Sequence, residues 1–114
     1  MADPATLLRA LKLARVPGKT VAEACARFGV SRGAYQKAKR DRRAELAWTD
    51  DELVLSGLVY FGGSADVADL VSFIDWINHS VYRAAEVRAI LTRLRTEGLV
   101  RRRGRAFRLA REWP

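Results

Sequence analysis

The stretch that decides the fold is LTRLRTEGLVRRRGRAFRL, residues 91–109. Apolar residues recur at helical spacing until Gly98, a residue typical of the position just after a helix. An extended segment starts at Leu99, and beyond RRRGR (101–105) the apolar residues Phe107 and Leu109 alternate with polar ones. This alternation predicts a β-hairpin with the basic run at its tip, and not a frayed basic tail.

Three apolar segments precede this hairpin. Residues 50–61, 65–79 and 83–97 each carry apolar residues at helical spacing, so we expect three helices. Thr49, with Glu52 three residues later, forms the pattern of a capping box at the start of the first one. Three helices followed by a basic hairpin resemble a winged helix-turn-helix domain, and this resemblance covers residues 50–112.

A second motif lies nearer the N-terminus, in VAEACARFGVSRGAYQKAKR, residues 21–40. A small residue, Cys25, stands where two helices would cross, and Gly29 follows in the turn between them. The motif resembles the helix-turn-helix of transposases, recombinases and many bacterial repressors. With a further helix expected over 4–15, we predict a mainly α protein. It would consist of a helix-turn-helix domain (1–46) and a winged helix domain (47–114) with a small C-terminal β-hairpin.

The charge is large and unevenly placed. The 114 residues carry a net charge of +8, which favours polyanionic partners. Residues 1–50 have a balance of +6, residues 51–82 contain no Lys or Arg and have a balance of −5, and residues 83–114 have a balance of +7. This partition suggests two faces that bind a polyanion (DNA, RNA or an anionic membrane) and one face turned elsewhere. All basic residues after Lys39 are arginine, which pairs with phosphates and guanine edges better than lysine does. A GC-rich genome would also produce this composition.

The resemblance also implies which residues contact DNA. In a helix-turn-helix the second helix enters the major groove, and the third helix of a winged domain takes the same role. The implied contacts in the first motif are Ser31, Arg32, Gln36, Lys37 and Arg40. Those in the winged domain are Arg83, Arg88 and Thr92 on the helix and Arg102, Arg103 and Arg105 in the wing. Tyr82 and Arg93 are also expected on the exposed side of that helix. The alternative for each is an ordinary solvated side chain.

The acidic segment 51–82 suggests a protein contact. Trp76 lies beside acidic and polar residues, away from the apolar face of its helix, and an exposed tryptophan suits an interface. The predicted interface residues are Asp69, Phe73 and Trp76, serving a homodimer or another protein. The alternative is that Trp76 folds under the Gly62-Gly63 loop or against the N-terminal motif.

Catalysis and cofactors have little support in the sequence. The only histidine, His79, ends a helix, and the only cysteine, Cys25, lies on an apolar face. No spacing suits a zinc site and no glycine-rich loop suits a phosphate. We therefore expect no enzyme activity, no metal and no cofactor.

The sequence also bears on location and role. No apolar run approaches the roughly 20 residues that span a bilayer, and the first residues do not resemble a secretory signal. We expect a cytoplasmic, nucleoid-associated protein of bacterial type without a membrane partner. The predicted function is sequence-specific DNA binding, in transcription regulation or DNA organisation. The alternative is a winged-helix adaptor for protein interaction, without specific DNA binding.

Overall fold

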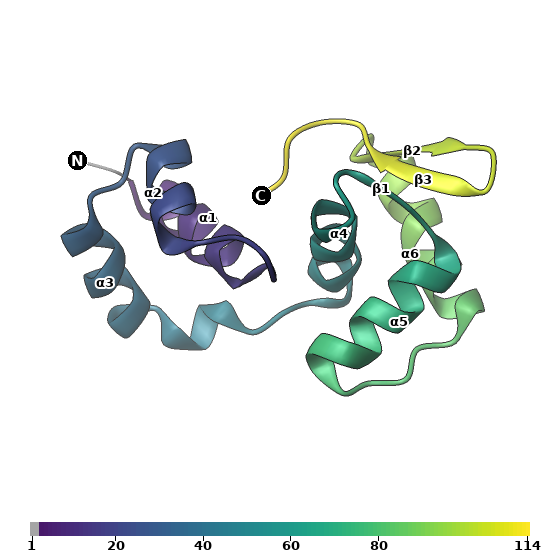
Figure 1. Ribbon diagram of the computed structural model, residues 1–114, viewed down its shortest axis with the longest axis horizontal. Coiled ribbons are helices and arrows are strands. Elements are labelled where there is room, and N and C mark those ends of the chain that lie inside the picture. The colour runs from purple at the N-terminus through teal and green to yellow at the C-terminus, as the bar shows by residue number, and fades with distance from the viewer. Residues whose placement is uncertain (1–2) are drawn as a thin grey trace. The chain divides into compact units, whose positions relative to one another are not determined.

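The computed structural model describes residues 3–114, with the side chains at positions 44 and 45 excepted. This part of the chain holds six α-helices, one short 3-10 helix and a three-stranded antiparallel sheet (Figure 1). The chain divides into two compact units, Met1–Ala47 and Trp48–Trp113. The predicted fold class, mainly α with a small β component near the C-terminus, is confirmed.

The first unit contains three α-helices. They are α1 (Pro4–Arg15), α2 (Val21–Phe28) and α3 (Arg32–Asp41), followed by the 3-10 helix η1 (Arg43–Leu46). Each α-helix begins where a side chain accepts a hydrogen bond from the backbone of its first turn. The capping residues are Asp3, Thr20 and Ser31. Because these caps satisfy N–H groups that the helix itself leaves unpaired, they fix the three starting points.

A tight turn joins α2 to α3. Gly29 ends α2 in the left-handed region, with φ of 62°, and the Val30 N–H donates to the Cys25 carbonyl at 2.9 Å. Cys25 and Val30 are buried, and they pack in one cluster with residues of α1 and α3: Ala10, Leu11, Tyr35 and Ala38. Cys25 is therefore a small core residue, as expected, and α2 and α3 are joined by a tight turn and share one core.

The second unit packs three helices around one core. They are α4 (Asp50–Tyr60), α5 (Val67–Asn78) and α6 (Ala84–Thr96). The predicted capping box at the start of α4 is confirmed, because Thr49 and Glu52 exchange side-chain-to-backbone hydrogen bonds, both of 3.2 Å. His79 ends α5 in the left-handed region, with φ of 50°, and its N–H donates to the Asp75 carbonyl. His79 therefore ends this helix, as the sequence predicts.

The sheet has one strand more than expected. Its strands are β1 (Ser64–Asp66), β2 (Val100–Arg103) and β3 (Ala106–Leu109), in the order β1-β3-β2. The predicted hairpin is confirmed by the β2–β3 pairing. The helix expected from residue 65 begins at Val67 instead, because residues 64–66 pair with the distant strand β3.

The wing is a hairpin with the two-residue turn Gly104-Arg105, where Gly104 has φ of 62°. Successive side chains of each strand point to opposite faces of the sheet. Val100 and Phe107 face the core, at 1% and 9% exposure, so the hairpin is fixed to the helices and is not a free tail. Trp48 and Trp113, whose ring centroids are 6.4 Å apart, bring together the two ends of this unit.

Candidate nucleic-acid interface

Helix α6 presents a polar strip opposite the side that it buries. The buried side consists of Val87, Ile90, Leu91 and Leu94. Arg88 and Thr92 are exposed and lie four residues apart, so their side chains project from the same strip. The Thr92 hydroxyl donates to the Arg88 carbonyl at 2.9 Å, which leaves its oxygen able to accept a further hydrogen bond.

A hollow of about 470 Å³ lies between this strip and the wing. It is lined by Arg88 and Thr92 of α6, by Arg102, Arg105 and Phe107 of the hairpin, and by Asp66, Val67 and Ala68 at the start of α5. Three arginines thus line one hollow together with a single acidic residue. The Asp66 carboxylate accepts the Asp69 N–H at 2.8 Å, so it serves as the cap of α5.

The start of α5 adds to the positive character of the hollow. Backbone N–H groups of a first helical turn have no partner within the helix, and the helix dipole makes this end attractive to anions. Val67 and Ala68 are the first two residues of α5, and both line the hollow. The site therefore combines arginine side chains with a helix end that favours negative charge.

The arginines of the hollow differ in how they are held. The Arg102 Nε donates to the Gly104 carbonyl at 3.1 Å, which fixes the side chain against the turn of the wing. The guanidinium groups of Arg88 and Arg105 have no hydrogen-bond or ion-pair partner within the described chain. One anchored and two unpaired guanidinium groups are suited to a phosphate, which accepts hydrogen bonds from several donors.

Two other predicted DNA contacts of this unit lie outside the hollow. Arg83 stands at the N-cap of α6, where its backbone N–H donates to the Glu86 carboxylate at 3.1 Å. Arg103 is exposed, and the alternation along β2 places it on the opposite face of the hairpin from Arg102. The structure therefore brings together four of the six predicted residues: Arg88, Thr92, Arg102 and Arg105.

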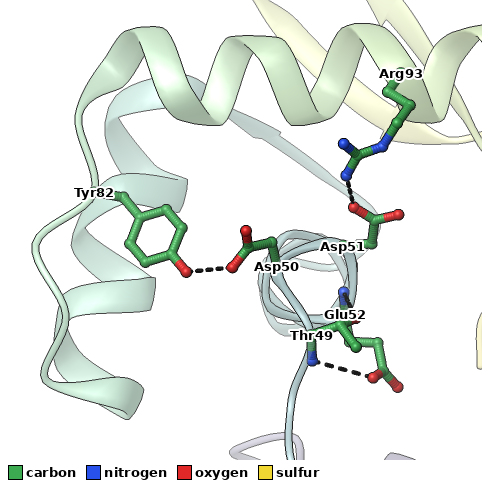
Figure 2. A network of polar contacts seen from close by, with 6 residues as sticks. All are labelled: Thr49, Asp50, Asp51, Glu52, Tyr82 and Arg93. Atoms are coloured by element: carbon green, nitrogen blue, oxygen red, sulfur yellow. Dashed lines mark hydrogen bonds and ion pairs between the residues drawn. The ribbon is translucent and has the colours of Figure 1, made fainter.

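Two residues expected on the exposed side of α6 are engaged by α4 instead (Figure 2). The Arg93 guanidinium forms an ion pair with Asp51. Tyr82 precedes the helix and is half-buried, and its hydroxyl donates a hydrogen bond to the Asp50 carboxylate. The hydrogen bond to the Asp50 carboxylate, together with burial, raises the pKa of Tyr82 to about 12. Arg93 is exposed, as expected, although it is paired with α4. The expectation of an exposed side chain at Tyr82 is wrong, because this residue is half-buried and bonded to α4.

The first unit carries its own row of polar residues on α3. Tyr35 and Ala38 face the core, and burial raises the pKa of the Tyr35 phenol. The predicted base-contacting and phosphate-contacting residues are all exposed: Arg32, Gln36, Lys37 and Arg40. Ser31 differs, because its hydroxyl accepts the Ala34 N–H at 3.2 Å and thus caps the helix.

The predicted protein interface is only partly exposed. Phe73 is 2% exposed, so its assignment as a surface contact is wrong: it is a core residue beneath Tyr60 and Trp76. Trp76 is 58% exposed, so it is not folded under a loop of its own unit. Asp69 is also exposed, two helical turns before Trp76.

Sequence reasoning missed two neighbours of Trp76. Tyr60 and Phe61 are 42% and 39% exposed, and the Tyr60 ring centroid lies 5.7 Å from that of Trp76. These three side chains form what we call the aromatic patch. Both missed residues fit the apolar pattern of α4, and nothing local in the sequence separates an exposed aromatic residue at a helix end from a buried one.

Other kinds of site have no counterpart in residues 3–114. No group of three or more His, Cys, Asp or Glu side chains there is placed to hold a metal ion. None of the described helices combines the length and apolarity needed to cross a bilayer. Comparison of the chain with family models, curated proteins and solved structures finds no match. Its function is therefore inferred from its own geometry and charge.

Proposed function

We propose that this protein binds double-stranded DNA sequence-specifically, as a transcription regulator or DNA-organising factor, and that it is not an enzyme. The observation that carries the proposal is the convergence of Arg88, Arg102 and Arg105 on one hollow beside the exposed strip of α6. Such a protein acts in the cytoplasm, on the nucleoid of a bacterial-type cell.

The hollow would hold phosphates while α6 enters the major groove. Arg88 and Thr92 lie on the strip that would face base edges, and arginine pairs in bidentate fashion with guanine. Arg102 and Arg105 would contact the backbone or the adjacent minor groove, which orients the protein on the duplex. The N-terminal end of α5 would face the same backbone, where its dipole favours a phosphate.

Helix α3 would supply a second reading surface. Arg32 and Gln36 are four residues apart on its exposed side, and glutamine pairs with adenine. Lys37 and Arg40, also exposed, would contact phosphates. Two reading helices in one chain would lengthen the recognised site.

The direct test is the affinity for a labelled duplex at low salt, measured by fluorescence anisotropy. The variant Arg88→Gln/Arg105→Gln should bind at least about tenfold more weakly, because it loses two charge-assisted contacts. The matched control Arg9→Gln/Lys19→Gln removes two exposed charges outside both predicted surfaces and should stay within about twofold of the parent. Absence of duplex binding by the parent would overturn the proposal.

The reading helix can be identified by selecting sequences from a pool of random duplexes. If α3 reads bases, Gln36→Ala should lose its sequence preference at one or two base pairs. If α6 reads bases, Arg88→Ala should do so. Each lost pairing should cost about 1–3 kcal/mol of binding free energy. If both variants select the same sequence as the parent, neither helix reads bases, and the sequence-specific part of the proposal fails.

The aromatic patch favours a second candidate, a winged-helix adaptor. Exposed Trp and Tyr side chains in contact with one another are enriched at protein interfaces. A parent that binds no duplex, but whose self-association measured by sedimentation is lost in Trp76→Ser, would establish the adaptor in place of the DNA-binding protein.

A further inference from the structure

The solvent face of the wing carries a second group of arginines, separate from the hollow. In the β2–β3 register, Arg101 lies directly opposite Arg108, and Arg108 lies opposite Ser64 on β1. Arg103 follows two residues after Arg101 on the same side of β2. All three arginines are exposed, and we call them the outer arginines.

The outer arginines face away from the hollow. Side chains alternate across a strand, so Arg101 and Arg103 point opposite to Val100 and Arg102, and Arg108 points opposite to Phe107. The strand β2 packs against α6 and the strand β3 against α4, with no helix of this unit over the other face of the hairpin (Figure 1). A straight duplex lying against α6 and the hollow therefore does not lie on the outer arginines.

The positive charges of this face are not neutralised within the chain. None of the outer arginine side chains has an ion-pair or hydrogen-bond partner in the part of the chain that the structure describes. Like charges directly opposite each other on neighbouring strands repel, so the Arg101–Arg108 pair lowers stability. Charged residues on a free sheet edge prevent aggregation, but β3 is the central strand, so this explanation does not apply to Arg108.

We propose that the outer arginines bind the phosphate backbone of a second duplex segment, so that one molecule bridges two segments of DNA. The inference rests on the proposed function, because the first segment occupies the hollow and α6. The second contact is to phosphates alone, since a flat arginine surface offers no element that enters a groove. It adds DNA bridging to sequence recognition and favours the DNA-organising form of the proposed function.

The experiment measures bridging and single-duplex binding separately. One duplex is immobilised on beads, a second labelled duplex is added, and its capture is followed as protein is titrated. Single-duplex affinity is measured by anisotropy with a short duplex in solution. The variant Arg101→Gln/Arg108→Gln removes two outer charges, and the matched variant Arg102→Gln/Arg105→Gln removes two charges from the hollow of the same hairpin.

We expect the outer variant to keep single-duplex affinity within about twofold of the parent but to lose at least about tenfold in capture. The hollow variant should lose affinity in both measurements. The melting temperature of the outer variant should equal or exceed that of the parent, because a repulsive pair is removed. If it falls instead, the single variant Arg108→Gln replaces it in both measurements.

Three results would overturn the inference while leaving the proposed function in place. The first is a parent that binds a single duplex yet captures no second one. The second is an outer variant that captures as well as the parent, which would assign bridging to a dimer. The third is an outer variant that loses single-duplex affinity as strongly as the hollow variant, which would mean that one duplex contacts both faces. A parent that binds no single duplex would contradict the proposed function itself.

Discussion

Two arginines of α6, Arg88 and Arg93, differ in whether they form an ion pair within the chain. Arg88 and Arg93 lie on the same helix and are both exposed. Arg93 pairs with Asp51 at the start of α4, whereas Arg88 has no such partner in the described chain and lines the hollow. Exposed ion pairs stabilise by only about 0–1 kcal/mol, so Arg93 acts chiefly by holding its own side chain towards α4.

The hydrogen bond between Tyr82 and Asp50 predicts a pH dependence of stability. The hydrogen bond and burial raise the pKa of the Tyr82 phenol from about 10 to about 12, because the neutral phenol is the donor. A raised pKa contributes stability below the pKa of the unfolded chain, and this contribution is lost as the pH rises from about 10 to about 12. Urea unfolding over this range should show a larger loss in the parent than in Tyr82→Phe, which keeps only the contribution of the buried Tyr35.

The ultraviolet absorbance of phenolate gives an independent measurement of the same group. Tyr82 should ionise later than a solvent-exposed tyrosine. Tyr82→Phe should reduce the late part of the titration by one group, because the buried Tyr35 also has a raised pKa. A Tyr82 phenol that titrates at its ordinary pKa near 10 would contradict the hydrogen bond.

At the scale of elements, the crossing of α4 and α5 depends on a glycine. A Cβ placed on Gly57 would stand 2.7 Å from Leu70 Cδ2 and 3.0 Å from Phe73 Cδ2. Gly57→Ala should therefore lower the free energy of unfolding by about 1–3 kcal/mol, despite the better helix propensity of alanine. All three tryptophans lie in this unit, so tryptophan fluorescence during urea unfolding reports the change.

Gly33 in α3 is the matched control. A Cβ at this position meets no atom within 4 Å, and the residue is exposed. Gly33→Ala should raise the stability of the first unit by up to about 1 kcal/mol, as measured by circular dichroism. A fall in stability for Gly33→Ala, or an unchanged stability for Gly57→Ala, would contradict the packing described for these helices.

Substitutions in the wing should distinguish residues needed for folding from residues needed for binding. Phe107 lies in the central strand at 9% exposure, and Phe107→Ala should cost about 3–5 kcal/mol of stability and weaken binding as a consequence. Replacing Arg102, Arg103 and Arg105 by alanine should change stability by less than about 0.5 kcal/mol each, because they are exposed. Thermal unfolding with a parallel binding titration checks both. Equal melting temperatures for Phe107→Ala and the parent would contradict the burial of this ring.

The elements that sequence predicts well are those with local signals. Asp3, Thr20 and Thr49 begin helices through bonds to residues three positions later, so their effect is visible in a short window. Strand β1 was missed because its three residues acquire strand structure only by pairing with β3, forty or more positions away. Tertiary pairing thus overrides a weak local preference.

At the scale of the whole molecule, the sequence predicted the basic character of α3, α6 and the wing but not how the arginines divide. Arg102 and Arg103 are neighbours in sequence, yet strand alternation sends them to opposite faces of the hairpin. Arg101 and Arg108 were not predicted as contacts, although the same alternation, applied to residues 100–109, would have found them. Phe73 and Trp76 differ in burial, and the sequence did not predict which of them is covered. Only the packing of α4 on α5 shows this.

The salt dependence of duplex binding tests the central claim most directly. Each phosphate contact releases counterions, so the logarithm of the affinity should fall with the logarithm of the salt concentration by about 0.9 per contact. We expect a steep slope for the parent. For Arg88→Gln/Arg102→Gln/Arg105→Gln we expect a slope shallower by up to about one unit for each lost contact. Identical slopes and affinities for parent and variant would show that the hollow contacts no DNA.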